Sequence, residues 1–430
     1  MATAVAAPWR RTFLTLCAAQ AMAMLAFGMA LPFLPLYIQE LGIADPREAA
    51  AWAGVMSACG MVVMATVAPI WGALADRHGR KAMVVRALFG GGAVVALMGL
   101  ARTPLQLLVL RTVQGAFSGT VSATRTLVAS VAPAAELGFA LGTMQTAAFI
   151  GTSIGPLLGG LIADRFGYGI AFGSTGVLLA ASGLAVLLLV REDFTPPAPA
   201  AAGTAGGLRG VLRLVLDVPG LAALIGTLFF VQAGMNAIGP ILPLFVQSLL
   251  PPDATDVAAL SGLMLGATAV TSAVAAGVAG KLGDRVGHER LLAVCAIGGG
   301  LLYFPQALVT TPQQLLLLRA CLGVFTGGLF PGVMATIALR SPASRRGLIF
   351  GVTATATALG NAAGPLVSAW VAGAYGLRAA FLVTATALTA AGVWVAIALA
   401  PRGPRRPRRP RRPACPHPGA VARILSTRSA

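Results

Sequence analysis

One stretch of this chain occurs twice, about half the chain apart. Residues 28–39 read GMALPFLPLYIQ and residues 236–247 read NAIGPILPLFVQ, which is an offset of 208 residues. The same offset carries GALADRHG at 72–79 onto GKLGDRVG at 280–287. Solenoid repeats have periods of about 20 to 50 residues, so a repeat of this length indicates a chain made of two duplicated halves.

The chain is too apolar for a soluble protein. Hydrophobic residues make up 57% and charged residues 10%, where soluble domains have about 25% charged residues. A helix that crosses the hydrocarbon needs about 20 mostly apolar residues, and a closed barrel would instead show short alternating segments. We therefore predict an all-α integral membrane protein whose twelve transmembrane helices form two pseudo-symmetric six-helix bundles. The predicted spans are 12–38, 50–74, 83–101, 105–130, 138–163, 168–190, 219–247, 257–280, 291–309, 312–338, 347–373 and 378–400.

The composition changes along the chain and predicts four parts. The linker between the halves ends in GLRGVLRLVLD, whose apolar residues at helical spacing either lie flat in the inner interface or extend the seventh span. The C-terminal tail is rich in Arg and Pro and is expected to be disordered. Because it directly follows the last span, we expect it to bind anionic lipid heads rather than nucleic acid. The predicted parts are an N-terminal bundle (1–190), a cytoplasmic linker (191–218), a C-terminal bundle (219–400) and the basic cytoplasmic tail (401–430).

The distribution of Lys and Arg predicts the orientation of the chain. With the N-terminus inside, these residues gather in the inner segments and few of them fall in the outer loops. Both termini are therefore expected in the cytoplasm, in a multi-pass protein of the cell (inner) membrane. The first apolar segment is too long for a cleavable signal peptide and is interpreted as the first span. The five cysteines show no paired spacing that would suggest a disulfide framework or a metal site. We also expect no cofactor, and we expect a monomer.

The repeated loop GALADRHGRK at 72–81 is predicted to be a gate between spans two and three. Gly72 is expected to let two helices approach closely, and Gly79 to permit a tight reversal. A hairpin that only obeys the positive-inside rule would explain the basic residues, but not Asp76 or the second copy of the loop. The residues of the two gating loops are Gly72, Asp76, Arg77, Gly79, Arg80, Lys81, Gly280, Asp284, Arg285 and Gly287.

The stretch GTSIGPLLGG at 151–160 is the second informative motif. Its glycines at every fourth position share one helix face, so a neighbouring backbone can pack tightly against it, and its proline bends the helix. Plain small-residue packing would explain the glycines alone. A weaker echo, GNAAGP at 360–365, keeps the repeat without the final glycine pair, and a one-residue insertion before it makes the offset between the halves 209 residues from here on. The residues of this motif are Gly151, Gly155, Pro156, Gly159 and Gly160.

Three of these segments together resemble one transporter family. The loop at 72–81 resembles the signature loop of the major facilitator superfamily, and RTVQG at 111–115 resembles its fourth-helix motif, which is linked there to proton transfer. The stretch at 151–160 resembles the fifth-helix antiporter motif, which in that family marks drug:proton exporters. The resemblance covers about residues 10–400. It implies a twelve-helix antiporter that is no enzyme, binds a small molecule, works by alternating access and is driven by a proton gradient.

Charged residues within the predicted spans are few and are all basic. Arg86 and Arg125 lie near the cytoplasmic edge, where they are expected to snorkel. Arg111 and Arg319 occupy matching places deeper in the two halves and are interpreted as functional. No acid lies at a span centre, which departs from the family, so a proton must use a rim acid, a cytoplasmic acid such as Asp76, or the substrate itself. The coupling candidates are Arg111, Gln114, Glu40 and Asp164.

Glu136 is a further departure, because it stands in AELGFALG where the other half has SRRGLIFG. An acid thus replaces Arg345 at the start of the fifth span. We interpret Glu136 as a partner for the gating loop, through an ion pair with Arg77 or Arg80. Such an exposed pair contributes only about 0 to 1 kcal/mol, so its role would be gating rather than stability.

The predicted function is export of amphipathic drugs or related organic compounds through a cavity between the bundles. Neutral or anionic substrates are favoured, because arginine is present and a cation would need a buried anion. The alternatives are a facilitator or importer of a small metabolite, and a non-transporting sensor acting through its tail, against which the two intact loops argue. Each polar cavity candidate has the alternative of joining helices to one another. Beside Gln114, the cavity candidates are Gln20, Pro32, Gln39, Gln145, Gln232, Asn236, Pro240 and Asn361.

Overall fold

The computed structural model describes residues 8–133, 136–192, 194, 220–341 and 346–399. The chain forms two compact units, Met1–Ala398 and Leu399–Ala430, and all the described helices belong to the first. The predicted tail lies outside the described residues, as do most of the predicted linker and Arg345. The predicted boundaries of the four parts stay predictions.

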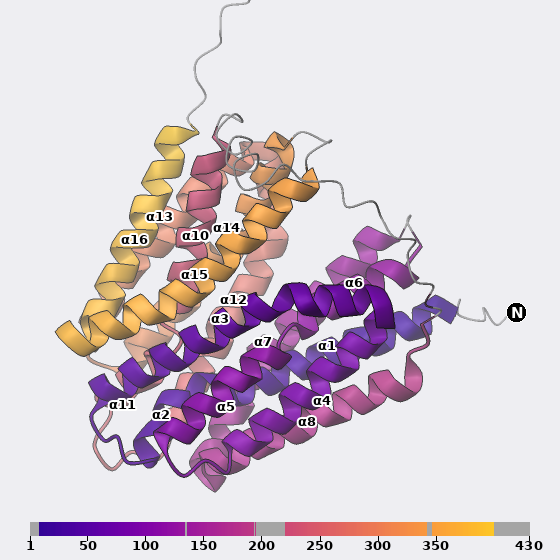
Figure 1. Cartoon of the computed structure of the whole chain (residues 1–430). Coiled ribbons are helices and arrows are strands. Elements are labelled where there is room, and N and C mark those ends of the chain that lie inside the picture. The colour runs from indigo at the N-terminus through magenta and orange to yellow at the C-terminus, as the bar shows by residue number, and fades with distance from the viewer. Residues whose placement is uncertain (1–7, 134–135, 193, 195–219, 342–345, 400–430) are drawn as a thin grey trace, which may run out of the picture. The chain divides into compact units, whose positions relative to one another are not determined.

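The described residues of the first half form a bundle of helices (Figure 1). Asp45 and Thr103 cap two of these helices with side-chain oxygens that accept from Arg47 N and Gln106 N, as these residue types do at helix starts. The elements are α1 (Pro8–Ala30), the 3-10 turn η1 (Leu31–Phe33), α2 (Leu34–Glu40), α3 (Pro46–His78), α4 (Arg80–Met98), α5 (Pro104–Phe117), α6 (Thr120–Val131), α7 (Leu137–Phe166) and α8 (Tyr168–Leu189).

The second half repeats this pattern. Within each half the helices pack on one another, α1 on α7 and α8 in the first and α10 on α15 and α16 in the second. A cluster of buried apolar side chains that includes Leu16, Leu127 and Met144 joins α1, α6 and α7. The elements are α10 (Leu221–Ala237), α11 (Leu242–Ser248), α12 (Val257–Val286), α13 (His288–Leu308), α14 (Pro312–Arg340), α15 (Arg346–Tyr375) and α16 (Leu377–Ala398).

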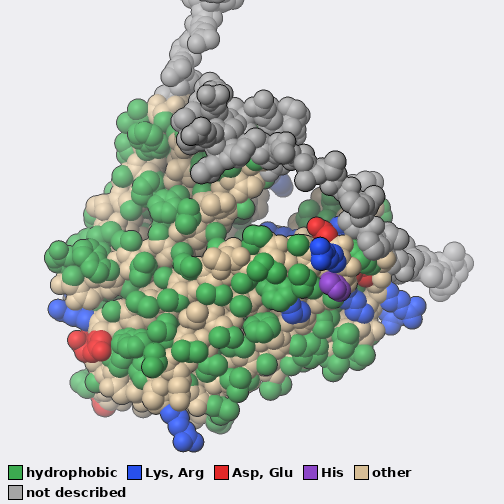
Figure 2. Space-filling model, in the orientation of Figure 1, with side chains coloured by type: hydrophobic (Ala, Val, Ile, Leu, Met, Phe, Trp, Pro, Cys, Tyr) green, Lys and Arg blue, Asp and Glu red, His purple; other side chains and the backbone are tan. Residues whose placement is uncertain are grey.

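The described helices have the length and surface of membrane spans. Nine of them are long and apolar enough to cross a bilayer, counting α1 to α2 as one, and α10 with α11 forms a tenth. The remaining predicted spans correspond to α15, which has 30 residues, and to α5 and α6 together. Figure 2 shows hydrophobic side chains spread over the surface, which suits contact with lipid rather than water.

Both copies of the repeated proline segment break a helix. The sequence predicts one continuous span at 12–38 and another at 219–247, but the first is interrupted by η1 and the second bends by 41° between α10 and α11. Pro32 and Pro240 lie at these two breaks. Proline lacks the amide that continues a helix and its ring clashes with the preceding turn, so the break follows from the repeated residue.

The fourth span, predicted as continuous at 105–130, is broken between α5 and α6. Gly119 has a φ of 114°, which only glycine adopts readily, and Ser118 is extended. The carbonyl of Ala116 accepts hydrogen bonds from Trp71 Nε1 at 2.8 Å and from Arg86 Nη1 at 3.3 Å, so the freed backbone is paired. The Arg86 guanidinium also lies 3.6 Å from the Trp71 ring centroid. Arg86 thus shares with Trp71 the pairing of a backbone carbonyl that the helix break frees, and the prediction that Arg86 snorkels stays a prediction.

Candidate functional site

The glycine motif of α7 packs against the backbone of α1. A Cβ added at Gly151, Gly155 or Gly159 would lie less than 3.0 Å from a carbonyl oxygen of α1. No real side chain tolerates that approach, so only glycine fits at all three positions. The tight packing predicted for this face is confirmed, whereas the role of the motif in antiport stays a prediction.

Among the described helices, the two main junctions between the bundles are α7 with α12 and α3 with α15. A Cβ on Gly262 would lie less than 3.0 Å from the Pro156 carbonyl, and a Cβ on Gly54 would lie 3.1 Å from the Pro365 carbonyl. Gly54 and Gly262 occupy matching positions in the two halves, and we call such residues repeat mates. Pro156 and Pro365 are repeat mates as well, so the same contact is made at both junctions. We call this end of the molecule, where α3 and α12 begin, the closed end.

The opposite end, which carries the gating loops, is the open end. Nothing lies within 4 Å of a Cβ added at Gly72, Gly142, Gly280 or Gly351, four positions that are also repeat mates. Figure 2 shows the surface hollowed between the two bundles at this end. Gly72 was expected to bring two helices close together, and this is wrong for the present conformation because the bundles stand apart here.

The first gating loop is held by an acid that the motif does not contain. Gly79 reverses the chain with a φ of 90°, as predicted. Glu192, directly after α8, accepts hydrogen bonds from Arg80 N at 3.0 Å and Lys81 N at 2.7 Å. It thereby caps the positive N-terminus of α4. Sequence analysis missed Glu192, whose only signal is that it is an acid directly after the sixth span. Asp76 is exposed, and its side chain makes no hydrogen bond or ion pair with another described residue.

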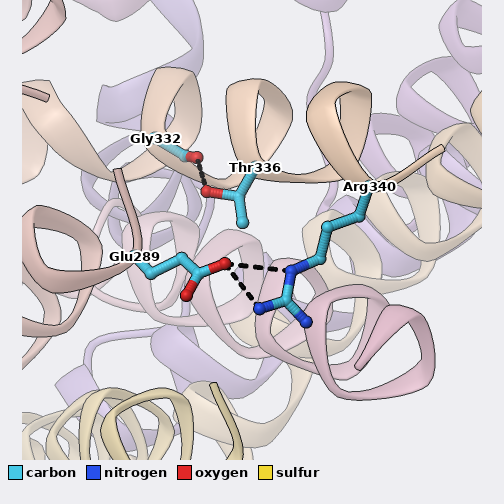
Figure 3. A network of polar contacts seen from close by, with 4 residues as sticks. All are labelled: Glu289, Gly332, Thr336 and Arg340. Carbon is cyan, nitrogen blue, oxygen red and sulfur yellow. Dashed lines mark hydrogen bonds and ion pairs between the residues drawn. The ribbon is translucent and has the colours of Figure 1, made fainter. Parts of the chain in front are cut away.

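The second gating loop has a different network (Figure 3). Gly287 again reverses the chain, with a φ of 98°, and Asp284 pairs with His288 at 3.1 Å. Glu289 accepts from the Arg340 guanidinium at 2.9 and 2.6 Å. By the offset of 208 residues, Glu289 matches Lys81, so the charge at this position is reversed between the halves.

Glu136 does not pair with the gating loop. Its carboxylate lies 3.5 Å from Arg10, near the start of α1, rather than beside Arg77 or Arg80 as predicted. Both partners are substantially exposed to solvent, so the pair contributes little to stability. The reason for the difference is that Arg77 is exposed and turned to solvent at the open end.

The two deep arginines are buried without a carboxylate partner among the described residues. Arg111 donates to Gln114 Oε1, one turn along α5. Arg319 lies beside Tyr303 of α13, and its Nε and Nη2 find no partner among the described residues. The described acids lie in loops or in the first or last turn of a helix, which agrees with the expected absence at span centres.

Polar side chains on α10 and α15 form one amide cluster. Asn361 Oδ1 accepts from Gln232 Nε2 at 3.1 Å and from Asn236 Nδ2 at 3.0 Å. The cluster is partly exposed, so its side-chain amides bond to one another and can still form hydrogen bonds with a further partner. Three of the cavity candidates are thus brought together in the second bundle.

In the first bundle the polar surface follows α6. Its exposed residues at helical spacing include Ser122, Arg125, Thr126 and Ser130, and polar residues on an exposed face indicate water rather than lipid. Arg125 donates to the Gln145 side chain on α7. Gln145 on the next helix therefore holds Arg125 within the polar face, and the prediction that Arg125 snorkels stays a prediction.

The remaining candidates are scattered. Gln20 is 1% exposed, and neither its amide oxygen nor its nitrogen has a partner among the described residues. Gln39 donates to the Ala44 carbonyl at 3.3 Å in the loop of the closed end, so its assignment to a central cavity is wrong. Glu40 is exposed at the same end. Among the described residues, no group of three or more His, Cys, Asp and Glu side chains could hold a metal.

Two repeated helical bundles, packed together at one end and apart at the other beside polar faces, define a membrane transporter. The profile of the Major Facilitator Superfamily matches residues 16–251 and 224–428. "Multidrug resistance protein MdtG" of Klebsiella pneumoniae (strain 342) is 36% identical over 360 residues, 84% of this chain and 86% of the relative. The protein of the same name from Escherichia coli (strain SMS-3-5 / SECEC) is 35% identical over 377 residues, 88% of this chain and 91% of the relative.

The chain belongs to the Major Facilitator Superfamily. Among solved structures, a bacterial homolog of the human lysosomal transporter Spinster, in an inward-facing and occupied conformation, superposes with a TM-score of 0.74. The match covers 92% of this chain and 97% of that chain at 15% identity, and it therefore shows the fold alone.

Proposed function

We propose that this protein exports amphipathic drugs or related organic compounds across the cell (inner) membrane in exchange for protons. The observation that carries the proposal is the similarity over nearly the whole chain to relatives named for multidrug resistance. The glycine face of α7 supports it, because a smooth helix surface suits one bundle rocking on the other.

The polar faces favour neutral or anionic substrates over cations. Arg125 with Gln145 on one bundle, and the Asn361 cluster on the other, offer hydrogen-bond donors at half-exposed positions. A buried cationic substrate would need an anion nearby, and the described acids lie at helix ends or in loops. Because the polar faces hold an arginine and amide groups but no acid among the described residues, we favour a neutral or anionic substrate.

The conformation is inward-facing if the gating loops lie in the cytoplasm, as the distribution of basic residues predicts. The open end then admits substrate from the cytoplasm, and the closed end bars its release. For the proton, the candidate acids are Glu40 and Asp164 at the closed end and Asp76 at the open end. No cofactor is proposed, and the chain is proposed to act as a monomer.

The test is drug accumulation in cells that express the full chain, with and without a protonophore, across neutral, anionic and cationic compounds. Export that fails when the protonophore is added supports the proposal. Export that continues unchanged would contradict proton coupling.

A facilitator of a small metabolite is the second candidate, because Arg111 has no acid beside it among the described residues. Inverted vesicles distinguish the two. An antiporter releases protons when substrate is added, whereas a facilitator moves substrate down its gradient without proton release.

A further inference from the structure

A helix at the closed end is capped from the opposite bundle. The amides of Ala258 and Ala259, in the first turn of α12, donate to the two carboxylate oxygens of Asp164 at 3.1 and 2.7 Å. Asp164 belongs to the last turn of α7, in the other half of the chain. A helix N-terminus presents unpaired amides and a partial positive charge, so a carboxylate is stabilised there. The first bundle therefore supplies the anion for a helix of the second.

Asp256, which directly precedes α12, is in position to cap this helix but does not do so. Asp256 is the N-cap residue, and aspartate is among the most favoured residues at that position. Its side chain nevertheless accepts no capping hydrogen bond and is exposed. It lies close enough to Asp164 for their like charges to repel. Two carboxylates thus compete for one pair of amides, and Asp164 holds them in this conformation.

The sister junction shows that the packing does not require a cap from the other bundle. There, Asp45 accepts from Arg47 N at 2.9 Å and caps its own helix, α3. The position on α15 that matches Asp164, 209 residues later, is Gly373. Both junctions keep the same contact between a glycine and a proline carbonyl. The cross-bundle cap is therefore an addition to one junction only.

We propose that Asp164 and Asp256 exchange as caps of α12 and that this exchange sets the balance between the closed and open states of this end. The proposal rests on alternating access in the proposed function. When α7 withdraws, Asp256 can turn onto the amides that Asp164 leaves, so α12 has an anionic cap in both states. The junction can then open without exposing an uncapped helix start.

The exchange predicts opposite effects for the two aspartates. Asp164→Asn removes the charge that favours the closed state, so the ratio of open to closed molecules should rise about five- to tenfold. Asp256→Ala removes the cap of the open state, so the same ratio should fall about fivefold. Combining the two substitutions should return the ratio toward that of the wild type. A merely structural role for either residue would reduce stability without opposite shifts.

Distances between two spin labels measure this balance directly. Leu100, just after α4, and Leu308, at the end of α13, are repeat mates at the closed end and are 74% and 72% exposed. The labels are placed at Leu100→Cys and Leu308→Cys in the full chain, in lipid nanodiscs, with the five native cysteines replaced. Opening of this end adds a longer distance, whose share gives the open fraction.

Asp45→Ala is the matched control, because it removes a cap at the same end that lies within one bundle. Its distance distribution should equal that of the wild type. The measurement needs neither substrate nor a proton gradient, so its outcome is independent of whether export is proton-driven. Opposite shifts for Asp164→Asn and Asp256→Ala would support the exchange. Shifts in the same direction, an unchanged distribution for Asp256→Ala, or an equal shift in Asp45→Ala would overturn it.

Discussion

At the scale of single residues, the two deep charges are basic, and neither has an acid as partner among the described residues. Arg111 is held by Gln114, and it lies against the backbone of Gly60 on α3. A guanidinium buried without an acid is costly, so such a residue inside a membrane is expected to serve transport. Its amide partner satisfies part of its donors and leaves its charge free to act on a proton or a substrate.

Arg111→Ala is expected to abolish uphill efflux while reducing downhill exchange much less, because it removes the charge and not the pathway. Arg111→Lys should restore function only partly, since a compact ammonium does not reproduce the guanidinium fork. The measurement is substrate flux in inverted vesicles with and without a pH gradient. Arg102→Ala, at an exposed arginine between α4 and α5, is the control. Equal losses in both flux modes would contradict a role in coupling.

The side-chain oxygen of Asn361 accepts hydrogen bonds from Gln232 and Asn236, so removing this side chain breaks both bonds. Asn361→Ala should weaken substrate binding about two- to tenfold, the range of one or two ordinary hydrogen bonds, while the protein stays folded. Binding to purified protein by calorimetry measures the change. Gln106→Ala, at an exposed glutamine at the closed end, should bind as the wild type does. Unchanged affinity in Asn361→Ala would remove the cluster from the substrate site.

At the scale of helices, the sequence predicts those features that depend only on the spacing of residues along one helix. Gly151, Gly155 and Gly159 are four residues apart, so they share a face whatever lies beside it. Arg86 is different, because its role depends on a break in α5 and α6 and on Trp71 of α3. Glu192 likewise acts on a loop more than a hundred residues earlier. Contacts between distant elements carry no periodic signal, and these are the parts that sequence reasoning missed.

Gly155→Ala tests the packing of α7 on α1. The new methyl group would meet the backbone of Leu25 at less than 3.0 Å, and forcing an extra carbon into such a contact costs about 1 to 3 kcal/mol. We expect a lower midpoint of thermal unfolding and loss of transport. Gly138→Ala, on the same helix with nothing within 4 Å, should be neutral or slightly stabilising. If both variants melted alike, backbone contact would not be what requires glycine at 155.

At the scale of the whole molecule, duplication lets matching positions of the two halves be compared at the closed end and at the open end. The main junctions of the closed end are two symmetric helix pairs, whereas at the open end no atom lies within 4 Å of a Cβ added at the matching glycines Gly72, Gly142, Gly280 and Gly351. Under the proposed alternating access, bundles that approach at one end separate at the other, so we expect the free space beside Gly72 and Gly351 to close when the cycle reverses. A glycine that has no neighbours while this end is open can therefore still be required for this end to close.

Gly72→Leu should leave the present conformation intact, because its side chain enters open space, yet it should block closure of the open end. Transport should fall at least tenfold, while substrate binding changes by no more than a few fold, because only the closed form of this end meets the added side chain. Spin labels across the open end should report one distance under all conditions, where the wild type shows two. Gly173→Leu, on α8 where nothing lies within 4 Å of an added Cβ, is the control, because the main packing partners of α8 among the described helices, α1 and α4, belong to its own bundle. Normal transport by Gly72→Leu would mean that this end closes elsewhere, and that the first copy of the gating loop is not part of the contact.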